Sequence, residues 1–333
     1  MKKWTIALCW ILPIVVALVS LGIGRYTIDL PEILKILFSH VFPLPKTWSN
    51  MEETVVMNIR LPRILLAILI GGGLSIAGAS FQGMFANPLV SPDILGVSAG
   101  AGFGASLGIL LFNTGFIAQF FALIFGLCAI GFTFMIAGYK KDSPLFMYVL
   151  AGVVTSALFQ ALVSLTKFVA DPEDKLPAIT YFLMGSLGTA SYHDLMIGGP
   201  IIIIGMIILY ILRWRINLLT LPDDEAKSLG IPLTRLKWTV IFGATLITAA
   251  SVAVAGIVGW VGLIIPHVAR MLVGNNNQHV LPVSVSIGAV YLLLIDTVAR
   301  SITATEIPLS ILTAIIGAPF FAILLRKTGG GWS

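Results

Sequence analysis

The side chains that most often do chemistry in proteins are scattered in this sequence. The four histidines are isolated from one another, at positions 40, 193, 267 and 279. Zinc needs three or four convergent ligands, so a polar contact at a helix end explains His267 better than metal ligation does. No Ser-His-Asp set or pair of catalytic carboxylates can be assembled. We therefore expect no catalytic, cofactor-binding or metal-binding residue in this chain.

Two further chemistries are disfavoured by what the sequence lacks. It contains no Gly-Lys pair, and hence no Gly-x-x-x-x-Gly-Lys-[Ser/Thr] loop to cradle the phosphates of ATP. Residues 65–92, 94–138 and 238–269 contain no Asp, Glu, Lys or Arg. Because ionisable groups inside a membrane mark proton and sodium pathways, their absence argues against an ion-coupled secondary transporter.

The segment 221–232 has the signals of a short, well-stopped helix. Pro222 suits a first helical turn, and three acids follow it at the positive end of the helix dipole. Gly230 fits the position after the helix, and Pro232 prevents continuation. Such a rigid piece could transmit force from a soluble motor. A simple connector is the other reading, and the local features alone favour it.

Two interruptions occur at corresponding places in the two halves of the chain. Residues 82–93 are polar with two prolines, and residues 255–267 are rich in glycine and end at Pro266-His267. A helix cannot continue cleanly through such segments. Broken backbone at membrane depth must be covered by protein or line a watery cavity, as in transporters built from two internal repeats.

Small residues recur at every fourth position beside the first interruption, as Gly71, Ser75, Ala79 and Gly83 and then as Gly96, Gly100, Gly104 and Gly108. Each set forms a smooth ridge that lets another helix approach closely. Packing within the chain is the simplest use for these ridges, and a subunit interface or a pathway wall is the alternative.

The elements that would position these features are membrane-spanning helices. Of 333 residues, 58% are apolar and 11% are charged, which is too little charge to cover a soluble protein. Ten apolar runs have roughly the length of a span, at 4–24, 61–83, 93–113, 116–138, 144–168, 195–212, 235–256, 257–274, 280–299 and 307–325. We predict an all-α polytopic membrane protein that forms one transmembrane domain over residues 1–333.

The charges between the spans predict their orientation. An even number of spans places both termini on one side, and more Lys and Arg fall on that side, which indicates the cytoplasm. The first run could be a signal peptide, but it has span length and no clear cleavage site, so we expect it to be retained. Outside, residues 25–60 contain a predicted surface helix at 31–38, and 169–194 form a connecting loop or a site for an external partner. Inside, 213–237 form the largest loop.

Several blocks resemble the FecCD family of ABC importer permeases, which move ferric siderophores, haem or cobalamin. They are RLPR at 60–63, GASFQ at 78–82, NPL at 87–89, PDILG at 92–96, FLMGSL at 182–187, GWVGLIIPHVAR at 259–270, DTVAR at 296–300, EIP at 306–308 and GAPF at 317–320. The resemblance extends from about residue 55 to 326 and keeps the order of the family's blocks.

The resemblance implies a type II ABC importer permease of ten spans. Such a chain works with a second permease subunit, identical or paralogous, with two ATPase subunits that bind ATP and Mg, and with an external substrate-binding protein. It also implies that 222–230 is the coupling helix, whose contacts with the ATPase are Asp223, Asp224, Glu225, Ala226, Leu229 and Gly230. Residues matching the pathway and its helix breaks are Gln82, Asn87, Pro88, Gly96, Gly100, Gly104, Pro266 and His267.

Three arginines, Arg60, Arg63 and Arg300, match outer-face arginines that pair with carboxylates of the binding protein. On physical grounds alone, snorkelling or loop stabilisation would explain them. We expect a non-enzymatic permease in the cytoplasmic membrane of a prokaryote that imports an iron chelate, with ferric siderophore favoured over haem or cobalamin. An ion-coupled transporter and a membrane enzyme or scaffold are the rival hypotheses.

Overall fold

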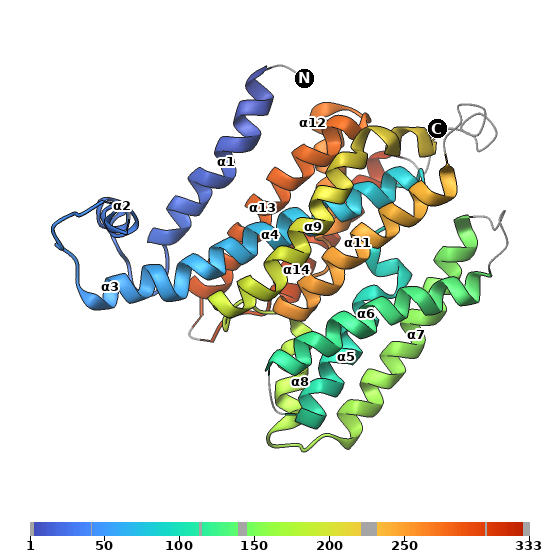
Figure 1. The fold of residues 1–333 in the computed structure, drawn as a ribbon, viewed down its shortest axis with the longest axis horizontal. Coiled ribbons are helices and arrows are strands. Elements are labelled where there is room, and N and C mark those ends of the chain that lie inside the picture. The colour runs from blue at the N-terminus through green and yellow to red at the C-terminus, as the bar shows by residue number, and fades with distance from the viewer. Residues whose placement is uncertain are drawn as a thin grey trace.

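The computed structural model describes residues 3–40, 42–112, 115–138, 145–220, 232–303 and 305–328, and the regular structure in these ranges is helical (Figure 1). The helices are α1 (Lys3–Gly22), α2 (Leu30–Ser39), α3 (Asn50–Thr54), η1 (Val55–Arg60), α4 (Leu61–Met84), η2 (Pro92–Leu95), α5 (Val97–Phe112), α6 (Gly115–Ala137), α7 (Leu145–Val169), α8 (Lys175–Met184), α9 (Tyr192–Ile216), η3 (Asn217–Thr220), α11 (Leu233–Ala255), α12 (Val261–Val273), α13 (Asn277–Ser301) and α14 (Leu309–Thr328).

Each of the ten predicted spans corresponds to a helix. Six helices in the described part are long and apolar enough to cross a membrane, and four shorter apolar helices, within α1, α5, α12 and α14, account for the rest. The predicted surface helix is also present as α2, where Ile33 and Ile36 are fully buried and Phe38 is exposed. The all-helical polytopic fold is therefore confirmed.

The helix boundaries differ from the prediction at two places. The helix that contains the span 61–83 starts at Asn50, because Ser49 and Glu52 form a capping box, and it continues without a break to Met84. The break after α11 ends at Val261, so Pro266 lies inside α12 instead of at its start. The chain tolerates this proline because another side chain binds a carbonyl that the proline frees, as described below.

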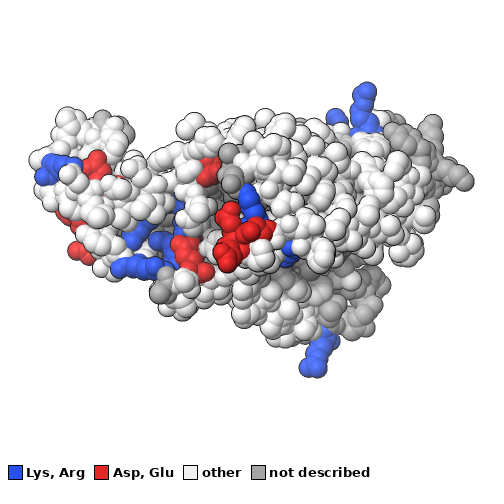
Figure 2. Space-filling view, turned by 90° about the horizontal axis from the view of Figure 1, so that it is seen from below, with Lys and Arg blue, Asp and Glu red and all other residues white. Residues whose placement is uncertain are grey.

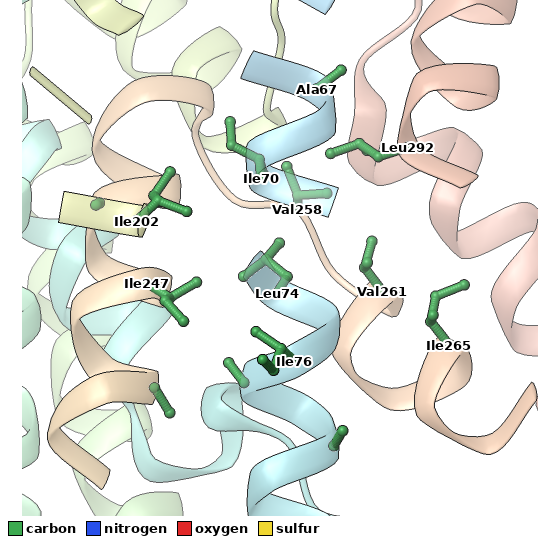
Figure 3. Packing of buried hydrophobic residues seen from close by; sticks show 14 of the residues in the cluster. Ala67, Ile70, Leu74, Ile76, Ile202, Ile247, Val258, Val261, Ile265 and Leu292 are labelled. Atoms are coloured by element: carbon green, nitrogen blue, oxygen red, sulfur yellow. The ribbon is translucent and has the colours of Figure 1, made fainter. Parts of the chain in front are cut away.

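Helix α4 is the centre of the bundle and packs against α9, α11, α12 and α13 (Figure 1). Of its most apolar window 83% is buried, against 22% for α7 at the periphery. Figure 3 shows Ala67, Ile70 and Leu74 of α4 among buried side chains of the neighbouring helices, including Ile202 of α9, Ile247 of α11 and Leu292 of α13. A second group, α5 to α8, joins this core through α11.

Many large apolar side chains face outward. Phe168 of α7 is 87% exposed and Trp10 of α1 is 65% exposed. Figure 2 shows a surface that is mostly uncharged, with the charged side chains gathered in a few places. This distribution fits helices that are surrounded by lipid.

The two ridges of small residues pack inside the chain. A Cβ atom on Gly71 would lie 2.3 Å from the carbonyl oxygen of Gly288 in α13, and one on Gly104 would lie 2.2 Å from that of Phe121 in α6. Gly100 meets α6 in the same way, and Gly96 adopts a positive φ of 84° beside Thr155. Packing within the chain therefore explains both ridges. The predicted role of Gly96, Gly100 and Gly104 in the pathway is then indirect, because these glycines set the position of α5.

Gly78 marks the closest approach between α4 and α12. A Cβ atom there would lie 1.9 Å from the carbonyl oxygen of Gly262, so Gly78→Ala should cost about 1–3 kcal/mol of stability by overpacking. Gly131→Ala in α6 is the matched control, because nothing lies within 4 Å of its Cβ position. Thermal unfolding of the purified protein should show a lower midpoint for the first variant alone. Equal midpoints would contradict the close contact.

Candidate functional site

The first helix break is built from short-range hydrogen bonds. After α4 ends, the side chain of Asn87 accepts a hydrogen bond from the backbone N–H of Leu89 at 2.9 Å, which forms a tight turn ahead of Pro92. The backbone N–H of Asn87 in turn donates to the carbonyl of Gln82. Asn87 is exposed and Pro88 is half-buried, so both lie in this turn as predicted.

The short helix η2 that follows the turn is held by α6 and α7. Thr133 donates to the carbonyl oxygen of Leu95 at 2.9 Å and lies 2.8 Å from Thr155. A Cβ on Gly152 would lie 2.1 Å from the carbonyl oxygen of Ile94, so only glycine allows α7 to approach here. The broken backbone is thus covered by protein, as its depth in the bundle requires.

Gln82 connects the two breaks. Proline has no N–H, so Pro266 leaves the carbonyl of Gly262 without its partner in α12. The Nε2 of Gln82, which is 2% exposed, lies 3.5 Å from that oxygen and donates to the carbonyl of Leu263 at 3.1 Å. The side-chain amide therefore replaces a hydrogen bond that the helix has lost.

The other end of the same amide binds a cation. Arg270, in the last turn of α12, donates from Nη1 to Oε1 of Gln82. His267 precedes Arg270 by one turn and is half-buried. The structure thus places Gln82 beside the turn of α12 that contains Pro266 and adds Arg270, to which the sequence assigned no role beyond the block 259–270.

The three predicted docking arginines have partners inside the chain. Arg63 is 5% exposed, and its guanidinium forms a bidentate ion pair with Asp296, with N–O distances of 2.8–3.0 Å. Its Nη1 also bonds Glu306 at 2.6 Å. Asp296 is fully buried. Together, the ion pairs of Arg63 with Asp296 and Glu306 join α4, α13 and the loop ahead of α14.

Arg300 and Arg60 complete this ionic network, which we define as Arg60, Arg63, Asp296, Arg300 and Glu306. Arg300 is 7% exposed, lies 3.8 Å from Asp296 and donates to the carbonyl of Ser20. Arg60 is 4% exposed and donates to the carbonyls of Leu21 and Tyr26. These bonds hold the three arginines to groups of their own chain, and docking on carboxylates of a binding protein stays a prediction.

Sequence reasoning did not assign a role to Asp296 and Glu306. The spacing of Asp296 and Arg300, four residues apart on one helix, was the available signal for an ion pair. The predicted ATPase contacts, Asp223, Asp224, Glu225, Ala226, Leu229 and Gly230, lie outside the described residues. Within the described ranges, no group of three His, Cys, Asp or Glu could hold a metal ion.

The comparisons with known proteins agree with this architecture. Residues 11–327 match the FecCD transport family. The chain is 43% identical to the molybdate import system permease protein MolB of Haemophilus influenzae, over 96% of this chain and 95% of that protein. It is 38% identical to an iron chelatin transport system permease protein of Helicobacter pylori (strain 26695), over 99% of both.

A solved structure described as an inward-facing, metal-chelate type ABC transporter is similar as well. It has 41% sequence identity and a TM-score of 0.86, and the match covers 96% of this chain and 97% of that one. The fold and the sequence thus define the membrane permease of a binding-protein-dependent ABC importer. The chain belongs to the FecCD transport family, and it is a transport subunit without a cofactor or catalytic role of its own.

Asp296 is the fully buried carboxylate of the ionic network, so Asp296→Asn should destabilise the protein by about 3–5 kcal/mol, because two buried arginines then have only the carboxylate of Glu306 in the network. Glu306→Gln is the milder comparison, since the Glu306 side chain is 25% exposed. Chemical or thermal unfolding of both variants measures the difference. A stability loss no larger for Asp296→Asn than for Glu306→Gln would refute the importance of the buried pair.

Proposed function

We propose that this permease imports a metal-bearing anion, with an oxyanion such as molybdate favoured over an iron chelate. The observation that carries the cargo proposal is the 43% identity with a molybdate permease over nearly the full length of both chains. A ferric siderophore, the cargo expected from the sequence, is the second candidate, because relatives named for iron chelatin transport are 38% and 37% identical.

The interior supports transport that is driven by a partner ATPase. The long stretches 65–92, 94–138 and 238–269 contain no Asp, Glu, Lys or Arg. A pathway lined by such helices offers no proton or sodium relay. Energy must then come from outside the chain, which agrees with the membership in an ABC importer family.

The helix ends that flank the predicted coupling helix lie at one end of the bundle, which we call the terminal end. There α1 starts and α4, α9 and α12 finish (Figure 1). Arg213 and Arg215 end α9 there and Arg235 and Lys237 begin α11, so the positive-inside bias supports a cytoplasmic terminal end. We place the ATPase contacts between these helices, on the acidic segment 221–231.

Reconstitution of the permease with its ATPase and binding protein in liposomes tests the proposed function. We expect uptake of radiolabelled molybdate. This uptake should require ATP on the side of the membrane to which the ATPase binds, and it should continue when a proton uncoupler is added. Parallel assays with a ferric siderophore test the second candidate. Uptake by the permease alone, or uptake that stops with the uncoupler, would show that the chain is an ion-coupled transporter instead.

Charge reversal in the acidic segment tests whether this segment contacts the ATPase. Asp223→Lys combined with Glu225→Lys should reduce co-purification of the ATPase and ATP-driven uptake by about tenfold or more, because electrostatic complementarity guides such contacts. Glu173→Lys, on an exposed turn between α7 and α8, is the control and should leave co-purification of the ATPase unchanged. If the double variant retains both the ATPase and full uptake, the segment is a connector.

A further inference from the structure

We propose that Arg270, oriented by Gln82, is a binding site for a tetrahedral oxyanion at the terminal end of the bundle. The inference rests on the proposed function in one respect only, that molybdate is the oxyanion that the cargo pathway would bring to the site. A phosphate group of a lipid has the same chemistry and is the other source of the ligand.

The first support is an imbalance of charge. In the ionic network at the opposite end, Arg63 and Arg300 share the carboxylates of Asp296 and Glu306. Arg270 is half-buried, and among the described residues no carboxylate lies within salt-bridge distance of it. A partly buried guanidinium with no described carboxylate beside it attracts an anion, and partial burial strengthens that attraction relative to bulk water.

The second support is the way in which the guanidinium is held. An arginine in the last turn of a helix usually reaches its own last carbonyls or extends into water. Arg270 instead donates to Gln82 on α4, while the amide of Gln82 is fixed by the carbonyls of α12 on its other side. This bond uses one donor, and in the described structure the remaining guanidinium donors have no acceptor.

The third support is the position of the site. Gln82 lies in the last turn of α4, directly before the exposed turn around Asn87. A Cβ on Gly262 would lie 3.7 Å from Pro92, so the start of α12 touches the segment that follows this turn. Through its bond to Gln82, the guanidinium of Arg270 is held beside the contact between α4 and α12. A planar guanidinium there can bind two oxygens of an oxyanion at once.

The test uses the purified complex of permease and ATPase in a maltoside detergent, without phosphate or nucleotide, and measures molybdate binding by equilibrium dialysis. Arg270→Gln should weaken binding about tenfold, which is about 1.4 kcal/mol. Arg270→Lys should retain part of the affinity, because an ammonium keeps the charge but cannot bind two oxygens at once, and it shows that the fold tolerates a change there. Gln82→Glu keeps Arg270 but supplies a fixed carboxylate, and it should weaken binding as well.

Arg213→Gln is the matched control, because Arg213 is a cation at the same end that stacks on Tyr210, with its Cζ atom 3.9 Å from the ring centre. A second arm counts phosphatidylglycerol retained by each complex. Loss of molybdate binding in Arg270→Gln but not in Arg213→Gln supports a cargo site, and loss of retained lipid alone supports the oxyanion site with lipid as its ligand. If both measurements are unchanged, the proposal is overturned, whereas failure of the proposed function would appear only in the uptake assay.

Discussion

The structure depends on one constraint, that polar groups removed from water must find their partners inside the protein. In a chain with 58% apolar residues, water is not available to most of the backbone. The consequences are visible at each irregular point. Thr133 binds the carbonyl of Leu95 where η2 ends, and Gln82 binds the carbonyls beside Pro266. Breaks that would be costly in lipid become stable, specific parts of the fold.

The same constraint explains the ionic network. Five ionisable side chains lie together at the end of the bundle opposite the termini, and Asp296 is fully buried among them. A buried pair contributes little net stability compared with apolar residues, but either partner alone is strongly unfavourable. The network therefore specifies which segments meet, namely α1, α4, α13 and the loop before α14. The arginines of the network bind carboxylates and carbonyls of their own chain, whereas Arg270 at the terminal end donates to the side-chain amide of Gln82.

Close packing of small residues holds the central helices of the bundle together. Hydrophobicity does not draw helices together in lipid, so dispersion contacts and backbone approach must do so. Gly71 and Gly288, and likewise Gly78 and Gly262, bring α4 into direct backbone contact with α13 and α12. The start of α12 is thereby held in direct contact with α4 and with Pro92 of the first break. The carbonyls bound by Gln82 lie on this same contact.

The sequence by itself determined that the chain is an all-helical membrane protein with ten apolar helices and two interrupted regions, because span length, proline and glycine act over a few residues. It did not determine the exact boundaries of the helices, since Pro266 lies inside α12. It also identified the small-residue ridges, but not their partners. Only the tertiary structure decided that Arg63 faces Asp296, 233 residues away, and that Gln82 meets α12, 181 residues away. Periodicity shows which face a residue occupies, but it does not show which helix covers that face. The sequence therefore did not show that the three arginines Arg60, Arg63 and Arg300 are buried against carboxylates and carbonyls of their own chain.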